Sequence, residues 1–300
     1  MNKKLKYAIF NTLRFIPNGI MLRAQYFVKL HRWLDLNKPQ RFTEWIQWYK
    51  AYYRNAEMPQ CTDKYLVRDF VKKQIGNDKY LNKLYQVCDN AKEIDFNSLP
   101  QRFVIKTTDG GNGDNIFICQ DKHSINIKDV IQKINGWRHK RYENISREWA
   151  YTGATNSRII VEEYLEDSNN KDGSIDDYKF LCFNGKFQYL WVDKNRYSDH
   201  RRGFWDKNLN FLSYVKSDHK TFDTPPVLPP NIKEMISLSE KLSAAFPFAR
   251  IDWYNLNGVI VFGEITFYPW SGYVQYTPDT FDFELGNCFA SAVKELNIKL

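Results

Sequence analysis

The chain has 300 residues, of which 43% are hydrophobic and 16% aromatic, and its formal net charge at pH 7 is +8. Enough apolar side chains are present for a sizeable core, which excludes a disordered chain. No apolar run approaches the roughly 18 residues of a membrane-spanning helix, and the basic N-terminus lacks the pattern of a signal peptide. Five scattered cysteines without a Cys-x-x-Cys pair exclude a disulfide scaffold and a cysteine-rich zinc site. We therefore expect a cytoplasmic protein of one or two domains.

Most of the positive charge lies near the N-terminus. Residues 1–54 carry eleven Lys and Arg residues against two acidic residues, which gives this segment a net charge of +9. Aromatic side chains recur from Phe42 to Tyr53 at helical spacing, which indicates either a helix packed on the core or a platform for a ligand. The charge fits docking to an anionic glycan or to a membrane surface. The sequence has no nucleic-acid-binding signature, so we expect no nucleic acid as a partner.

The pattern along the chain changes from helices to strands near residue 100. Helices are expected through residues 1–90, with Asp63 as the cap of a helix over Lys64–Gln74. The later expected elements are strands at 103–106 and 116–119, a helix at 125–140, a strand at 158–165, a hairpin of 178–183 and 186–192, a helix at 233–246, and a hairpin of 249–254 and 259–267. This order predicts an α+β fold.

A glycine-rich segment, Lys106-Thr-Thr-Asp-Gly-Gly-Asn-Gly113, joins the first two expected strands. Glycines let several backbone N–H groups turn toward one anion, and Lys106 can neutralise phosphate oxygens. The segment is not a P-loop, because no Gly-Lys-Ser/Thr closes it and a strand follows. It is compatible with a flap over phosphates or with an ordinary glycine hairpin.

The last expected hairpin carries two carboxylates, Asp252 and Glu264. A three-residue turn ending at Gly258 would place both on one face, together with Arg250 and Thr266. Carboxylates among apolar neighbours are costly unless a cation binds, and Mg²⁺ typically takes one or two carboxylates plus nucleotide phosphates. The alternative is an ion pair between Arg250 and Glu264 on a solvated face.

The strand at 158–165 ends in Glu162, Glu163, Tyr164 and Leu165. These residues are compatible with a plain edge strand. They are equally compatible with a segment that offers backbone groups to an adenine ring and a carboxylate to a ribose.

In their order, these segments resemble the ATP-grasp superfamily, and the chain is similar to its TupA-like family of polysaccharide-biosynthesis proteins. The matching segments are residues 39–48, 63–68, 99–106, 177–185, 246–252 and 262–269. The resemblance implies an ATP-grasp fold, with two α+β subdomains that clasp ATP, after a basic helical segment at residues 1–60. It divides residues 61–300 into a flap subdomain at about 100–175 and a metal- and substrate-binding subdomain at about 176–300.

The resemblance also implies a role for each matching residue. The expected nucleotide-binding residues are Arg68, Lys106, Gly110, Gly111, Gly113, Glu162, Glu163, Tyr164, Leu165 and Lys179. The expected Mg²⁺ ligands are Asp252, Glu264 and Thr266, the last standing where ATP-grasp ligases usually have Asn. The expected catalytic residues are Arg250 and Lys106, and the expected substrate-binding residues are Arg196 and Arg250.

These roles imply an ATP- and Mg²⁺-dependent ligase that joins a carboxylate to an amine through an acyl phosphate. The expected substrates are a hexuronic acid of a capsular or cell-surface polysaccharide and an amino acid or amine. A sugar kinase on the same fold, a glycosyltransferase and a non-catalytic scaffold stay open as alternatives. The expected location is the cytoplasm, and the basic N-terminal segment adds the option of docking at the inner membrane face, beside membrane-bound polysaccharide machinery.

Overall fold

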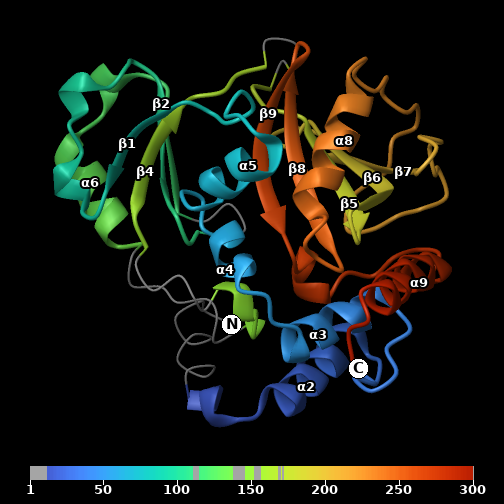
Figure 1. Ribbon diagram of the computed structural model, residues 1–300. Helices are drawn as coiled ribbons and strands as arrows, with labels where there is room; N and C mark the ends of the chain where they lie inside the picture. Colours follow the sequence, from blue (N-terminus) through green and yellow to red (C-terminus); the bar gives the residue numbers. More distant parts are fainter. Residues whose placement is uncertain are drawn as a thin grey trace.

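The structure, a computed structural model, describes residues 12–110, 115–137, 146–151, 157–167, 170 and 172–299. Helices come first along the chain and two antiparallel sheets follow (Figure 1). The first described elements are η1 (Leu13–Phe15), α2 (Asn18–Leu30), α3 (Phe42–Tyr52), α4 (Glu57–Thr62) and α5 (Val67–Ile75). The expected α+β class and the helical N-terminal segment are confirmed. No helix in the described ranges combines the length and the apolar character needed to cross a membrane.

The first sheet has four strands in the order β1 (Leu84–Cys88), β4 (Ile159–Glu163), β2 (Phe103–Thr107) and β3 (Ile116–Cys119). Its apolar side packs on α6 (Ile127–Asn135), so that Phe103 and Ile105 share a core with Ile134. The connections contain short helices η2 (Ala91–Glu93), η3 (Phe96–Ser98), η4 (Lys122–Ser124) and η5 (Trp149–Tyr151). Because side chains alternate along a strand, Lys106 faces away from this core.

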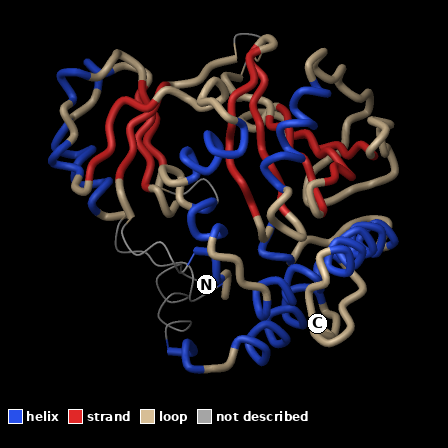
Figure 2. Tube along the Cα trace, in the orientation of Figure 1, coloured by secondary structure: helices blue, strands red, loops and turns tan. Residues whose placement is uncertain are grey.

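The second sheet has five strands in the order β7 (Arg201–Asp206), β6 (Lys186–Lys194), β5 (Asp177–Phe183), β8 (Ala249–Leu256) and β9 (Val259–Thr266). Helix α8 (Ile232–Ser243) packs against β5, β6 and β8. The chain ends with η6 (Pro269–Gly272) and α9 (Thr280–Glu295). Figure 2 shows the strands of the two sheets as separate groups.

The aromatic side chains of α3 belong to the core. Trp45, Trp48 and Tyr49 are all at most 3% exposed. The ring of Trp45 stacks on that of Phe289 in α9, with centroids 5.2 Å apart. Of the two interpretations of this segment, the core helix is therefore correct.

The expected strands and hairpins are found close to their expected limits, but three elements were not expected. Strand β1 lies within residues 1–90, where only helices were expected, so that expectation is wrong for this segment. No element was expected over β7 or α9, although Phe281, Leu285 and Phe289 recur at helical spacing in α9. The helix expected from Lys64 begins only at Val67. Asp63 instead accepts hydrogen bonds from the backbone N–H groups of Tyr65 and Leu66, at 2.8 Å each, in the turn before it.

The contact between α9 and the start of α3 depends on Gly286. A Cβ atom at this position would lie 2.0 Å from the backbone oxygen of Gln40. Replacing Gly by Ala inside a helix is normally neutral or stabilising, but here the added methyl must displace backbone. We predict that Gly286→Ala lowers the free energy of unfolding by about 1–3 kcal/mol, measured by urea denaturation. Ser291→Ala, at an exposed position of the same helix, is the matched control and should change little; equal stability of the two variants would contradict this packing argument.

Candidate nucleotide and metal site

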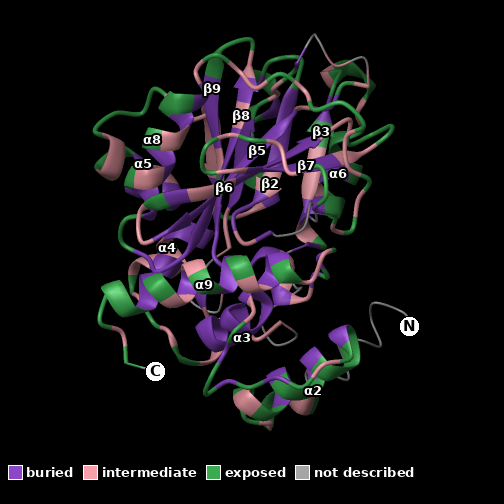
Figure 3. Ribbon diagram, turned by 90° about the vertical axis from the view of Figure 1, so that its right-hand side faces the viewer, coloured by how far each residue is buried: buried purple, intermediate pink, exposed green. Residues whose placement is uncertain are grey.

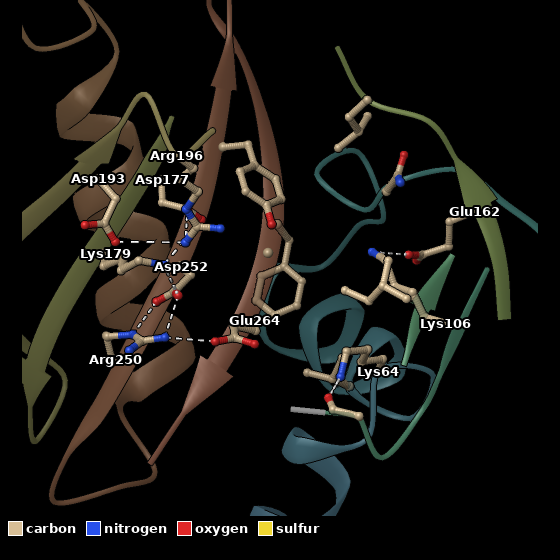
Figure 4. Close-up of a pocket in the computed structure, with 18 of the residues that line it drawn as sticks. Lys64, Lys106, Glu162, Asp177, Lys179, Asp193, Arg196, Arg250, Asp252 and Glu264 are labelled. Atoms are coloured by element: carbon tan, nitrogen blue, oxygen red, sulfur yellow. Dashed lines mark hydrogen bonds and ion pairs between the residues drawn. The ribbon is translucent and has the colours of Figure 1, made fainter. Parts of the chain in front are cut away.

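A cavity of about 480 Å³ lies between the two sheets. One wall comes from α5, β2 and β4 with Lys64, Lys106 and Glu162, and the other from β5, β8 and β9 (Figure 4). Its cationic residues are Lys64, Arg68, Lys106, Lys179, Arg196, Arg202 and Arg250, and its acidic residues are Glu162, Asp177, Asp193, Asp252 and Glu264. Seven cations against five carboxylates make this cavity suited to an anionic ligand.

The hairpin of β8 and β9 brings the two carboxylates together in a way that the sequence did not predict. Leu256 pairs with Val259, so the turn has two residues, Asn257 and Gly258, with φ values of 52° and 90°. The expected three-residue turn is therefore wrong, since Asn-Gly with two positive φ angles forms a two-residue turn.

A bulge corrects the register that this short turn would impose. With the turn alone, Asp252 would pair with Gly263 and the two carboxylates would lie on opposite faces. The register shifts beyond Asp252, so that Asp252 lies directly opposite Glu264 and Arg250 opposite Thr266. Gly263 is the extra residue, and a Cβ there would lie 2.9 Å from the backbone oxygen of Asp252. The expected shared face is present, but the bulge produces it.

Arg250 holds this face together. Its Nε and Nη2 donate to the two oxygens of Asp252, at 2.7 Å each. Its Nη2 also donates to Glu264 Oε1 at 2.8 Å and to Thr266 Oγ1 at 3.0 Å. Arg250 is only 7% exposed. The ion pair of Arg250 and Glu264 therefore exists, and it joins a buried guanidinium to a carboxylate whose side chain is 51% exposed.

The charges of this network stabilise one another. Burial opposes the charge on Arg250, but Asp252 and Glu264 outweigh it and raise the pKa of the guanidinium. Burial would likewise raise the pKa of the Glu264 carboxyl, but Arg250, Lys179 and Lys64 lower it to about 2. Glu264 is thus ionised throughout the neutral range.

These carboxylates fit a divalent cation that is shared with phosphates. Among the described residues, no group of three or more His, Cys, Asp or Glu side chains is placed to hold a metal ion. Both oxygens of Asp252 accept hydrogen bonds from cations, including one from Lys179 Nζ at 2.7 Å. The side chain of Glu264 is 51% exposed. Glu264 is therefore the more accessible ligand, and a cation here would need further oxygen atoms from its ligand.

The opposite wall places two cations around one carboxylate. Lys106 Nζ lies 3.0 Å from Glu162 Oε2, and Arg68 Nη1 lies 3.4 Å from Glu162 Oε1. Lys64 Nζ donates to the backbone oxygen of Gly110, at the start of the glycine-rich segment. Burial lowers the pKa of Lys64. Gly110 lines the cavity, whereas Gly111 and Gly113 lie outside the described residues.

The residues expected beside the adenine ring, Glu162 to Leu165, divide between the cavity and the outer surface. Glu162 and Leu165 line the cavity. Glu163 is exposed, and Tyr164 lies under the guanidinium of Arg102, which is 5.2 Å from the ring centroid. Neither residue lines the cavity, and the backbone of Glu163 donates to Lys83 O at 2.9 Å and accepts from Asn82 Nδ2 at 3.0 Å.

The far end of the cavity contains residues that sequence reasoning missed or left without a role. Asp177 and Asp193 pair at the start of β5 and the end of β6. Arg196, an expected substrate residue, contacts Asp177 there, and Arg202 donates to Asp193 at 2.6 Å. In the sequence, the only sign of this cluster is that Asp177 and Asp193 lie at the two ends of a predicted hairpin. Burial raises the pKa of the Asp177 carboxyl.

Two tryptophans close this end. The rings of Trp191 and Trp270 stack with centroids 4.2 Å apart. Trp270 belongs to a left-handed turn in which Trp270, Ser271 and Gly272 have φ values of 48°, 58° and 69°. Such a backbone conformation is costly for residues other than glycine and needs support from its surroundings.

Helix α3 supplies this support through Lys50. The side chain of Lys50 is fully buried, and its Nζ donates to Ser271 O at 2.7 Å and Ser271 Oγ at 2.6 Å. Gln47 Nε2 donates to Ser271 O at 3.0 Å and Gly272 O at 3.1 Å. Burial lowers the pKa of Lys50 from 10.5 to about 7. The N-terminal segment thus holds a wall of the cavity.

The buried lysine predicts a pH-dependent stability. Between pH 7 and 10.5 the unfolded chain binds a proton at Lys50 that the folded chain has lost, so this residue makes the folded state more stable as pH rises. We predict that the unfolding free energy of wild type minus that of Lys50→Met increases from pH 7 to 9.5, by at most about 1.4 kcal/mol per pH unit.

Lys241→Met, at an exposed position of α8, should show no such pH-dependent difference from the wild type. A difference between wild type and Lys50→Met that stays constant over this range would contradict the titration of Lys50.

Comparisons with known proteins place this chain in a family. The sequence profile of the family described as "TupA-like ATPgrasp" matches residues 44–290. A D-alanine–D-alanine ligase from Bacillus anthracis is similar in structure, with 15% identity and a TM-score of 0.47 over 79% of this chain and 68% of that protein. An L-amino acid ligase from Bacillus licheniformis gives 12% identity and a TM-score of 0.47 over 85% of this chain and 55% of that protein. A search of curated proteins finds no match.

Proposed function

Because the chain belongs to the TupA-like ATP-grasp family and shares its general chemistry as an ATP-dependent ligase, we propose that it attaches an amino acid or amine to a hexuronic acid. The acid belongs to a capsular or cell-surface polysaccharide or its precursor, and the reaction requires Mg²⁺. The observation that carries the proposal is the pair of facing carboxylates, Asp252 and Glu264, in a cavity with excess positive charge.

The nucleotide binds between the two sheets in this proposal. Arg68 and Lys106 hold its phosphates, supported by their position around Glu162, and Lys179 reaches it from the opposite wall. The backbone from Glu162 to Leu165 lies beside the adenine. The segment from Gly110 through Gly111 and Gly113 covers the phosphates. The subdomain boundaries near residues 60, 100 and 175 belong to the same proposal.

Asp252 and Glu264 are the residues that would hold Mg²⁺, with Thr266 beside them, and the ion would need further oxygen ligands beyond these two carboxylates. When bound, the ion neutralises charge on the phosphates. Thr266 Oγ1 donates to Glu264 Oε1 at 2.9 Å, so it supports the ligand Glu264 whether or not it contacts the ion itself.

The reaction proceeds in two balanced steps. An oxygen of the substrate carboxylate attacks the γ-phosphorus of ATP, an acyl phosphate forms, and ADP leaves. The amine then attacks the acyl carbon and loses a proton, an amide forms, and inorganic phosphate leaves. Arg250, held in orientation by two hydrogen bonds to Asp252, stabilises the charge on the acyl phosphate together with Lys106.

The carboxylate of the sugar enters from the end of the cavity near Arg196. This side chain is 38% exposed, so it keeps part of its hydrogen-bonding capacity while it contacts Asp177. Trp270, which stacks on the buried Trp191 and is itself partly exposed, lines the cavity and offers an aromatic edge to the sugar.

The direct test is ATP turnover by the purified chain with Mg²⁺, a panel of uronic acid glycans and a panel of amino acids and amines. We predict ADP and phosphate only when both an acid and an amine are present, and an adduct whose mass equals acid plus amine minus water. Formation of ADP and a phosphorylated sugar without any amine would show that the protein is a kinase and not a ligase. Binding of a nucleotide-sugar without any binding of ATP would show that it is a glycosyltransferase.

Substitution of Glu264 tests the metal site. We predict that Glu264→Gln lowers ATP turnover by about 10²-fold or more, because the neutral amide is a weaker ligand for Mg²⁺ and leaves charge on the phosphates unbalanced. Raising the Mg²⁺ concentration should recover part of the loss, as measured by initial rates.

Glu295→Gln is the matched control, because Glu295 lies at the end of α9, its side chain is 44% exposed in an ion pair with Lys186, and it does not line the cavity. It should retain wild-type turnover. Full turnover by Glu264→Gln, with thermal unfolding confirming that both variants are folded, would remove Glu264 from the metal site.

A further inference from the structure

The outer face of α2 carries exposed apolar side chains. Ile20 is 60% exposed, Phe27 41% and Val28 70%. The opposite face of the same helix, with Leu22, Tyr26 and Leu30, is buried in the main core. Figure 3 shows exposed and buried colours on opposite sides of α2, which lies at the edge of the molecule. The helix therefore has a second apolar surface that the described part of the chain leaves uncovered.

Two further exposed aromatic residues flank the helix in the sequence, and one of them contacts this surface. Trp33, directly after the helix, is 81% exposed, and its ring stacks on Phe27 with centroids 4.6 Å apart. Phe15, before the helix, is 80% exposed. We name the residues Phe15, Ile20, Phe27, Val28 and Trp33 the α2 face. Tryptophan and phenylalanine are the residues that insert most readily at the boundary between lipid headgroups and acyl chains.

Basic residues accompany this face and acidic residues are missing from its sequence. Residues 1–33 contain seven Lys and Arg residues and no Asp or Glu. Arg14 and Arg23 are exposed beside the apolar residues. The segment therefore combines an apolar stripe with a net positive charge, part of which is paired, since Arg32 Nη1 lies 2.7 Å from Asp279 Oδ1. Exposed basic residues beside an apolar stripe are the pattern of a helix that lies in a membrane interface.

We propose that the α2 face binds the surface of a membrane that contains anionic lipids. The apolar residues enter the headgroup region, and Arg14 and Arg23 contact lipid phosphates. Helix α2 lies in the plane of the membrane and the rest of the chain stays outside it. This binding does not depend on the proposed ligase reaction, and it would hold the enzyme where membrane-attached glycans are assembled.

Charge and exposed apolar area favour an anionic membrane over two other ligands of the α2 face, a second copy of the chain and a soluble glycan. A second copy of the chain would bring two basic faces together, and their repulsion opposes a dimer through α2. A soluble anionic glycan would satisfy the arginines but would leave the exposed rings of Trp33 and Phe15 in water. An anionic membrane satisfies both the charges and the apolar side chains.

Co-sedimentation of the full chain with lipid vesicles tests the proposal. We predict binding to mixed vesicles of phosphatidylcholine and phosphatidylglycerol, weaker binding to phosphatidylcholine alone, and loss of binding at high salt. The double variant Val28→Ser, Trp33→Ser and the double variant Arg14→Glu, Arg23→Glu should each weaken binding by about tenfold or more. Brominated lipids should quench part of the wild-type tryptophan fluorescence, and Trp33→Phe should abolish that part.

Matched controls change the same residue types elsewhere. Val227 is 94% exposed in a loop, and Lys241 is exposed on α8. Val227→Ser and Lys241→Glu should bind vesicles like the wild type. The proposal is overturned if the wild type binds no vesicles, or if the α2 variants bind as well as the controls. A dimer in light scattering that the Val28→Ser, Trp33→Ser variant dissociates would assign the face to a second copy instead.

Discussion

One buried guanidinium organises the site of this protein. Arg250 binds Asp252 through two hydrogen bonds and reaches Glu264 and Thr266 with the same group. Two carboxylates on adjacent strands would repel each other in a dry environment, and the desolvated Arg250 makes their proximity favourable. The bulge at Gly263 brings these groups together, and Arg250 then balances the two carboxylates on the cavity wall.

Around this network, the two walls of the cavity differ in how their charges are paired. In the wall from β5, β8 and β9, Lys179 and Arg250 are paired with Asp252 within one continuous sheet. The opposite wall offers Lys106 and Arg68, which share the single carboxylate Glu162. A polyphosphate needs fixed ligands on one side and available cations on the other, and the cavity provides this division.

The N-terminal helices connect two functions that are separate in sequence. Helix α3 is core, and through Lys50 it supports the left-handed turn that carries Trp270 into the cavity wall. Helix α2 packs on the same core and also presents an uncovered apolar and basic face. The excess positive charge near the N-terminus therefore lies apart from the excess in the cavity, and the two suit different anionic partners.

The sequence by itself determined the α+β class and the hairpins, because turn residues and alternating strands are local signals. Its resemblance to a family indicated ten of the 23 residues that line the cavity. Only the tertiary structure decided how Asp252 meets Glu264, since Asn257-Gly258 favours a two-residue turn and a bulge at Gly263 must correct the register. It also decided the partners of Lys50, Asp177 and Arg202, which come from distant segments. Such pairings depend on how the sheets and helices pack, and no local pattern encodes them.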